Sequence, residues 1–489
     1  MSPCNANSVS RAKAVARTVT TIVIALTSTI VIALAGCANP SGIVSNAKLV
    51  EAAKVGVSSS TGQAALAADW WQGFGDPALT SLIDQAVAGS PTLRVAEARL
   101  ARVAVNASTA RAAEGPQLNG AFDATRQRFS ATSIYPPPLG GTIRETATLQ
   151  LNGSWELDLF GRNRAALDAA IGQQRAAEAD AAASRIVLAV NVARNYVQLA
   201  RLLEHREVLQ RSLAQRDQVL GLIRQRVSAG LDTSAELRQG EGALPETRQQ
   251  IESVDEQMAL VRHAIAALAA LPPDSLDTLA PRLSAVRAVP APDLVPADLL
   301  GRRADIVAAR WRVEAATGDV ASARAQFYPN INLIAFAGLS SIGLDRLVQA
   351  GSEQYGVGPA IRLPIFDSGR LRANLRGKTA DLDAAIDTYN GSVIDAVHDV
   401  ADQISSSRSL DRQQREQAAA TASAESAYDV ATQRYRAGLA TYLTVLTAET
   451  NVLAQRRIGV DIRARALDTQ MLLMRALGGG YAPPAAAVS

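Results

Sequence analysis

The sequence contains the same series of elements twice, which constrains the fold more than any single motif. In each half, a helical stretch leads to a proline, two alternating strands, a very long helix, a glycine break and a second long helix. The clearest matching segments are residues 226–233 and 434–441, with further matches between 116–119 and 329–332 and between 159–162 and 365–370. The matches lie roughly 206 to 213 residues apart, as a duplication requires.

Four segments alternate between apolar and polar residues and are predicted to be strands, at about 116–129, 145–160, 329–343 and 353–366. One face rich in acids and amides and one apolar face would suit a membrane barrel with a wet lumen, although a half-buried soluble sheet has the same periodicity. Four strands cannot close a barrel, and a bilayer tolerates no open sheet edge. About two or three copies must therefore combine to reach a minimum of about eight strands.

The helices predicted after the strands are very long, at 162–229 and 369–437, and return helices are predicted at 233–271 and 441–477. A helix over 162–227 would extend about 100 Å, and its apolar residues recur at nearly coiled-coil spacing. Pro245 should kink the first return helix or mark a bulge. A proline-rich linker, 272–297, separates the first repeat, 76–271, from the second, 298–480.

The N-terminus is predicted to be a secretory signal peptide covering residues 1–36. Arg11, Lys13 and Arg17 precede an apolar stretch that ends at Cys37, in a sequence that resembles the bacterial lipobox. We expect a covalent lipid on Cys37, an anchored extended segment over 37–75 and a short tail at 481–489. A transmembrane anchor is the alternative. Ala38 lacks the aspartate that retains such lipoproteins at the inner membrane, which favours the outer membrane.

Charge and cysteine content exclude several classes of function. Without the three cations of the signal segment, the 49 basic residues fall to 46 and equal the 46 acidic residues. The remaining chain has no basic stripe, so nothing predicts nucleic-acid binding. Only Cys37 would remain after cleavage, so no disulfide can form within the chain.

No pattern in the sequence predicts an enzyme. His205, His263 and His398 are widely separated on predicted helices without metal-ligand spacing, and each is interpreted as a solvated residue. The paired acids on the helices are likewise interpreted as solvated faces. Gly478 to Gly480 follow a helix, so they predict a helix stop instead of a phosphate loop. We expect no catalytic residue, no metal site and no cofactor apart from the lipid.

Several motifs resemble the TolC-type outer-membrane efflux family, specifically the NodT-like lipoproteins that serve resistance-nodulation-division pumps. They lie at residues 70–79, 299–306, 435–438 and 476–481. The resemblance implies a mainly α-helical chain with a small membrane β part. It also implies a homotrimer with a 12-stranded β-barrel, a periplasmic α-barrel and an equatorial domain. The implied partners are a periplasmic membrane-fusion adaptor and an inner-membrane proton-driven pump.

The resemblance also assigns roles to the two glycine turns. It implies that Gly230, Leu231, Gly438 and Leu439 lie at periplasmic tips that contact the adaptor. Simple capping of the helices by glycine is the alternative interpretation of these positions.

Just beyond Gly438, the resemblance places a periplasmic gate. Leu443 matches an apolar gate residue, whereas Thr444 and Thr447 occupy positions that commonly carry aspartates. Tyr435 and Glu236 fit two positions of a latch between the coils, but the position of the latch arginine is Ala440 here. We expect a Tyr435–Glu236 hydrogen bond and a gate closed mainly by Leu443, which would open more easily than a gate with the full latch.

Three classes of function fit parts of the sequence: an efflux duct, a general porin and a periplasmic scaffold. A porin would need more strands per chain, and a scaffold would lack the strands. The sequence therefore predicts a passive exit duct for small molecules in a tripartite system. Type I protein secretion and metal efflux remain alternatives, although Met258, Met471 and Met474 form no methionine cluster.

Overall fold

The computed structural model describes residues 39–51, 66–132, 134–288 and 299–482, and the chain divides into two compact units. The first comprises 1–48, 102–174 and 311–387, and the second comprises 49–101, 175–310 and 388–489. Each unit takes segments from both halves of the chain. Both units therefore contain parts of the predicted repeats, 76–271 and 298–480. The predicted signal peptide, Cys37 and residues 483–489 lie outside the described residues.

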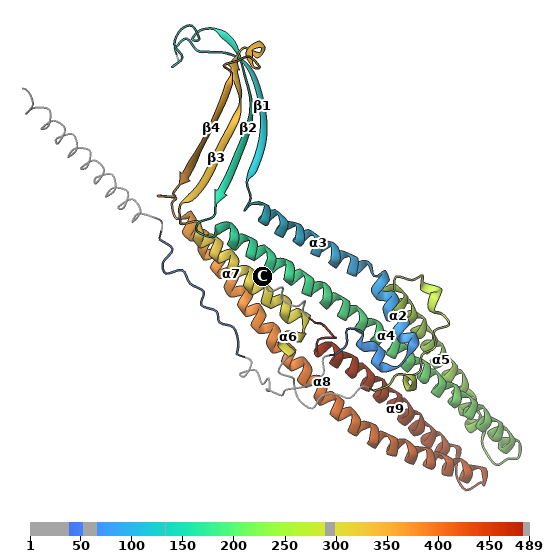
Figure 1. Ribbon diagram of the computed structural model, residues 1–489. Helices are drawn as coiled ribbons and strands as arrows, with labels where there is room; N and C mark the ends of the chain where they lie inside the picture. Colours follow the sequence, from blue (N-terminus) through green and yellow to red (C-terminus); the bar gives the residue numbers. More distant parts are fainter. Residues whose placement is uncertain (1–38, 52–65, 133, 289–298, 483–489) are drawn as a thin grey trace, which may run out of the picture. The chain divides into compact units, whose positions relative to one another are not determined.

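The first unit contains a four-stranded antiparallel sheet in the order β1-β2-β3-β4 (Figure 1). Its strands are β1 (Gln117–Arg128), β2 (Ile143–Leu157), β3 (Asn330–Ile342) and β4 (Glu353–Arg362). β4 ends at Arg362, before the predicted end at residue 366, because Pro364 has no N–H to donate to a sheet. Among the described residues, β1 and β4 each pair with one strand only, so both outer edges of the sheet lack a partner.

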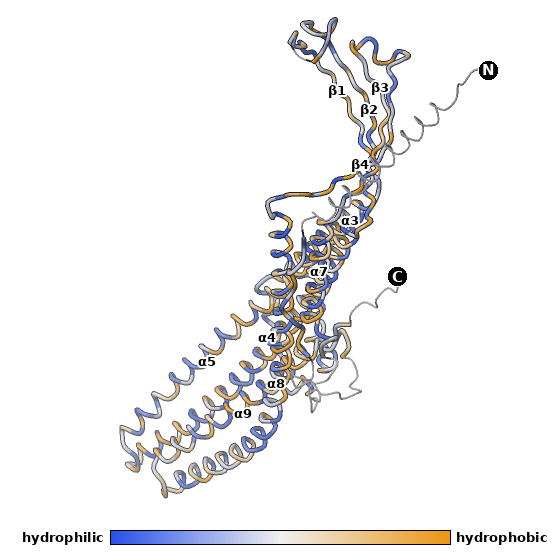
Figure 2. The backbone as a smooth tube through the Cα atoms, turned by 90° about the vertical axis from the view of Figure 1, so that its left-hand side faces the viewer, coloured by the Kyte–Doolittle hydropathy of each residue, from blue (hydrophilic) through white to orange (hydrophobic). Residues whose placement is uncertain are grey.

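The strand register sorts the side chains onto two different faces. Leu149 pairs with Leu339, and Trp155 pairs with Leu333, on one face. Asn152 pairs with Asn119 on the other. Figure 2 shows the resulting alternation of hydrophilic and hydrophobic residues along the strands. The apolar face exposes large side chains in the single chain, including Leu118, Phe122, Leu149, Leu151, Trp155, Tyr355, Val357 and Ile361.

The long helices have matching lengths in the two halves. α4 (Arg162–Ser228) and α8 (Arg370–Arg436) each have 67 residues, and α5 (Ser234–Leu268) and α9 (Tyr442–Ala476) each have 35. α5 continues through Pro245 as one helix. Shorter helices are α2 (Pro77–Gly89), α3 (Pro91–Ala112), α6 (Leu299–Arg302) and α7 (Ala304–Ala325). No helix among the described residues is both long and apolar enough to cross a membrane.

Small residues bring helices together in the first unit. A Cβ on Gly172 of α4 would lie 3.0 Å from Ala315 of α7, and one on Gly318 of α7 would lie 2.9 Å from the carbonyl oxygen of Ala165. Nearby, Ile43 from the N-terminal segment is buried in a cluster with Phe327, Leu371 and Leu375. The segment after the predicted lipid site is therefore packed onto the protein at this point.

An aromatic cluster anchors the core of the second unit. Trp70, Trp71 and Phe74 are buried in a 3-10 helix, Trp70–Phe74, so the end of the predicted extended segment 37–75 is helical and packed. The carboxylate of Asp76 caps α2, accepting from the Ala78 N–H at 2.9 Å. It also accepts the hydroxyl of Tyr196 on α4 at 2.7 Å. This contact ties the N-terminal segment to α4.

Part of the proline-rich segment also belongs to this core. Leu283 and Val286 are buried in the same cluster as the tryptophans. The Arg287 N–H donates to the Phe74 carbonyl at 2.9 Å. Residues 272–288 are therefore packed structure and not a free linker, whereas residues 289–298 lie outside the described residues.

The three glycines after α9 have a packing role as well as ending the helix. Gly478, Gly479 and Gly480 all have positive φ, at 100°, 54° and 74°. A Cβ on Gly478 would overlap the Arg302 carbonyl, and one on Gly480 would overlap the carbonyl of Ala67. Only glycine permits both this backbone conformation and this approach of three separate segments.

We expect Gly480→Ala to destabilise the protein by about 1–3 kcal/mol, because the new Cβ adds a steric clash to an unfavourable φ. Gly377→Ala is the matched control. Gly377 lies inside α8, where a Cβ would meet no atom within 4 Å. That substitution should raise stability by about 0.5–1 kcal/mol, since alanine is the better helix former. The midpoint of thermal unfolding of each purified variant measures both effects. Equal shifts in the two variants would contradict the requirement for glycine at position 480.

Candidate gate at the helical hairpin tips

The two helical hairpins end in the same backbone motif. Gly230 follows α4 with φ 71°, and Gly438 follows α8 with φ 75°. The Leu231 N–H donates to the Arg226 carbonyl at 2.9 Å, and the Leu439 N–H donates to the Arg434 carbonyl at 2.8 Å. These bonds reach back over the glycine and satisfy carbonyls at the end of each helix. The glycines therefore cap the helices in both halves.

The next helices begin differently in the two halves. Thr233 and Glu236 form a reciprocal capping box at the start of α5, in which the Thr233 N–H donates to the Glu236 carboxylate at 2.7 Å. Thr441 caps α9 without a side-chain bond to the backbone, and its hydroxyl lies 3.4 Å from that of Thr444. Glu236 is thus engaged within its own turn.

Tyr435 connects the two hairpins through Asp232 and Arg226. The Tyr435 hydroxyl donates to Asp232 Oδ2 at 2.5 Å. Arg226 donates to both oxygens of the same carboxylate, at 2.9 and 3.0 Å. Arg226 also donates to the Tyr435 carbonyl at 3.2 Å, and its guanidinium carbon lies 4.7 Å from the centre of the tyrosine ring. We call Arg226, Asp232 and Tyr435 the tip latch.

The tip latch corrects one expectation. The hydrogen bond expected between Tyr435 and Glu236 is not formed, because the hydroxyl is directed to Asp232. Residue 440 is alanine, and Arg226 is the arginine that bonds to the carboxylate accepting from Tyr435.

Burial makes the tip latch stronger than an exposed ion pair. Tyr435 is fully buried, and the Arg226 and Asp232 side chains are 13% and 5% exposed. Hydrogen bonding to Arg226 lowers the pKa of the Asp232 carboxyl. Burial and the bond to Asp232 raise the pKa of Tyr435. Because the pKa of Asp232 is lower in the folded state, ionised Asp232 stabilises the folded protein at pH values above the ordinary aspartate pKa. This stabilisation is lost as the pH falls through the folded pKa.

Sequence reasoning missed Arg226 and Asp232, although the aligned tips contained a signal for Asp232. Arg226 matches Arg434 in the other half, so it did not stand out. Asp232 matches Ala440, and Tyr435 matches Val227. Asp232 in the first half and Tyr435 in the second half thus bond to each other, and each occupies a position where the other half has a different residue.

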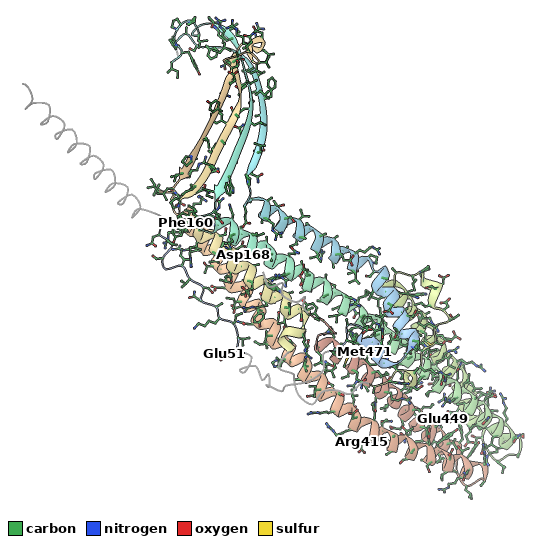
Figure 3. The ribbon with its side chains drawn as sticks, viewed as in Figure 1. Glu51, Phe160, Asp168, Arg415, Glu449 and Met471 are labelled. Atoms are coloured by element: carbon green, nitrogen blue, oxygen red, sulfur yellow. The ribbon has the colours of Figure 1, made fainter. Side chains whose placement is uncertain are left out.

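A second buried network joins α4, α5 and α9 further from the tips. Arg216 donates to Glu449 at 2.9 Å, to the Thr247 hydroxyl at 2.8 Å and to the Ala243 carbonyl at 3.1 Å. The side chains of Arg216 and Glu449 are 12% and 7% exposed. Figure 3 labels Glu449 on α9. The interpretation of the helix acids as solvated is therefore wrong for Glu449.

His205 also has a partner, in contrast to its interpretation as a solvated residue. Its Nε2 lies 2.9 Å from Asp461, which Arg201 also contacts at 2.6 Å. Burial lowers the pKa of His205. Over the described ranges, no group of three or more His, Cys, Asp or Glu side chains could hold a metal ion.

Three of the predicted gate residues, Leu443, Thr444 and Thr447, lie exposed at the start of α9. Leu443 is 62% exposed, and Thr444 and Thr447 are exposed beside it. The Thr447 hydroxyl donates to the Leu443 carbonyl at 2.9 Å, within the helix. Tyr442 and Val445 on the opposite face are buried with Tyr435. Tyr435 therefore packs inside the chain with the rest of the tip latch, whereas Leu443, Thr444 and Thr447 are exposed.

The predicted adaptor-contact residues are also exposed. Leu231 and Leu439, next to the two capping glycines, are 66% and 70% exposed. Each tip thus presents an apolar side chain that is mostly exposed. Such residues are candidates for contact with another protein.

Comparison with known proteins gives consistent matches over most of the chain. A family model described as outer membrane efflux protein matches residues 82–271 and 295–479. The multidrug resistance outer membrane protein MdtQ of Escherichia coli O6:H1 is 34% identical over 420 residues, which cover 84% of this chain and 88% of MdtQ. The similar solved structures include the outer membrane protein VceC of Vibrio cholerae and the outer-membrane channel OprN. VceC has a TM-score of 0.80 at 36% identity, covering 84% of this chain and 98% of VceC. OprN has a TM-score of 0.78 at 26% identity, covering 90% and 98%.

We expect Tyr435→Phe to lower the free energy of local opening at the hairpin tips by about 1–3 kcal/mol, because it leaves the buried Asp232 carboxylate without one of its hydrogen-bond donors. Hydrogen exchange of the amides at 229–233 and 434–440 measures this local opening. Glu236→Gln is the matched control, since glutamine also completes a capping box. If Glu236→Gln accelerated exchange as much as Tyr435→Phe, Asp232 would not be the principal partner of the tyrosine.

Proposed function

The chain belongs to the outer membrane efflux protein family, and we propose that three copies of it form a gated exit duct. It is an outer-membrane efflux component with a transport role, conducting small molecules passively to the exterior. The observation that carries the proposal is a four-stranded sheet with an exposed apolar face and two edges that are unpaired within the described ranges. In a bilayer these edges must pair, and three copies would supply a closed barrel of 12 strands.

The two faces of the sheet fit opposite sides of such a barrel. The face with Leu149, Trp155 and Val357 would contact lipid, because these large apolar side chains are 46%, 42% and 76% exposed in the single chain. The face with Asn119, Asn152 and Gln150 would line a wet lumen. The long helices that follow β2 and β4 would then extend into the periplasm and end at the hairpin tips.

We place the gate at these tips. The tip latch holds the second hairpin, through Tyr435, against the turn of the first, through Asp232. Leu443, Thr444 and Thr447 would face the corresponding residues of the other copies, because they are exposed in the single chain. Leucine would close the aperture by apolar contact, and the threonines would give it no acidic ring. Breaking the tip latch would free the second hairpin to move outwards.

The same proposal extends to the anchor and the partners. A lipid on Cys37 would hold the N-terminus at the outer membrane, and the packed segment around Ile43 follows within a few residues. A periplasmic adaptor would contact the exposed tips and connect the duct to an inner-membrane proton-driven pump. Because MdtQ is named for multidrug resistance, we propose drug-like small molecules as the cargo.

Leu443→Ala and Tyr435→Phe should each raise the conductance of the protein in planar bilayers. The first removes apolar closure, and the second removes a buried hydrogen bond worth about 1–3 kcal/mol, which corresponds to roughly 5- to 150-fold more open channels. Cells carrying either variant should also become more sensitive to antibiotics that the outer membrane excludes. Thr447→Ser is the control. Unchanged conductance in both variants would rule out a gate at this position.

Leu231→Asp and Leu439→Asp should abolish efflux while the protein remains folded in the outer membrane. Each replaces an exposed apolar contact worth about 1.5–3 kcal/mol, so adaptor binding should weaken about tenfold or more. Arg238→Gln is the control, since Arg238 is exposed on α5 beyond the turn. Drug susceptibility and co-purification of the adaptor measure the effect. Full efflux in both leucine variants would show that the adaptor binds elsewhere.

A further inference from the structure

The polar face of the sheet contains a band without ionisable side chains. Its middle row pairs Asn119, Asn152, Phe336 and Gly356 across all four strands. The rows on either side pass through Gln150 and Ser154 of β2 and contain only uncharged residues. We call these three rows the collar. At about 3.4 Å per residue, the collar spans about 14 Å along the strands.

Charged residues on this face lie at the two limits of the collar. Asp123 occupies the next row towards the β1–β2 loop, and Glu156 occupies the next row towards α4. A solute passing along this face would therefore meet charge, then a neutral stretch, then charge again.

Phe336 is exceptional within the collar, because it is an aromatic residue on a polar face. Its ring covers Gly356 of β4, where a Cβ would lie only 2.7 and 2.9 Å from two ring carbons. Glycine thus permits the ring to lie against the backbone of the neighbouring strand. Phe336 nevertheless remains 36% exposed. One side of the ring packs on the sheet, and the rest is available to a solute.

A second glycine permits an amide bridge beside this ring. The Gln354 side chain on β4 donates to the Gln150 side chain on β2 at 2.9 Å. Gly338 of β3 lies between them in the register, so no side chain separates the two amides. Gln150 donates in turn to Asn152. Gly338 is two residues from Phe336 on β3, so the amide bridge and the ring are neighbours on the sheet surface.

We propose that Phe336 and the Gln150–Gln354 bridge form a contact site for uncharged planar aromatic solutes on the wall of the duct. This inference rests on the proposed function, because it requires the polar face to line the lumen. The phenylalanine offers an aromatic surface on which a planar ring packs favourably. The amides offer hydrogen bonds to polar groups at the solute's edge. An ion would find no opposite charge in the collar to offset its lost hydration.

The site has the properties of a transit contact and not of a tight pocket. It is a flat area of sheet, so it would bury only one side of a solute, whereas ligand pockets bury most of theirs. Three copies would place three such areas around the lumen. Weak contacts of this kind would raise the local concentration of aromatic cargo without retaining it.

The test uses a cysteine reporter next to Phe336 in the full-length protein in intact cells. Ser154→Cys replaces a residue of the collar by one of similar size, in the row beside Phe336. A membrane-impermeant maleimide is added outside, with or without millimolar indole as the neutral planar probe. The parent chain without the added cysteine is the blank, and it should stay unlabelled if Cys37 is acylated.

Indole should slow the labelling of Ser154→Cys when Phe336 is present. Combining this change with Phe336→Leu should weaken the protection about two- to tenfold, because the side chain remains apolar but the ring is lost. Phe336→Tyr should retain the protection, and it also serves if the leucine variant does not fold. Gln354→Leu should weaken the protection by removing the amide bridge. Cyclohexanol, similar in size but not planar, should protect less than indole.

The contact site would be overturned if indole slowed the labelling of Ser154→Cys equally with phenylalanine or leucine at position 336. It would also be overturned if indole gave no protection at all. Failure of the proposed function has a different signature. Val357→Cys lies on the opposite face of the sheet and should resist the maleimide. If Val357→Cys were labelled and Ser154→Cys were not, the polar face would not line the lumen.

Discussion

The structure depends on one constraint, which is that a sheet edge cannot remain unpaired inside a bilayer. The described part of the chain contains four strands, of which β1 and β4 each have a single neighbour there. In the described single chain, the backbone N–H and C=O groups at the two sheet edges thus lack strand partners, and the apolar face of the sheet is exposed. In the proposed duct, association of copies would solve both problems at once, since it would pair the edges and set the apolar face towards lipid. The helices can then form the soluble part of the same assembly.

The sequence was most informative where one pattern repeats over many residues. The four alternating strands and the long helices were predicted within a few residues of their limits, because their periodicity extends over many turns or pairs. The packed parts of segments 37–75 and 272–297 were not predicted. Trp70 and Leu283 are buried by residues distant in the sequence, and no local periodicity reports such contacts.

The tip latch shows the same limit at the candidate gate. The sequence singled out Tyr435, but its partner depended on a choice between Asp232 and Glu236, four residues apart. The capping box engages Glu236 and leaves Asp232 for the tyrosine. Glu449 was equally hidden, because only the approach of α4 and α5 reveals that it is buried beside Arg216. The two hairpins are similar in sequence, and the bond between them is made by Asp232 and Tyr435, two positions at which they differ.

The equal lengths of the helices in the two halves limit how such a chain can change. α4 and α8 have 67 residues each although their sequences have diverged. Deleting one residue from α4 would rotate everything beyond it by about 100° and shift it by about 1.5 Å. Arg226 would then leave Tyr435, and Arg216 would leave Glu449. Substitutions can accumulate on these helices one at a time, but a change in length must occur in both halves together or be confined to the loops.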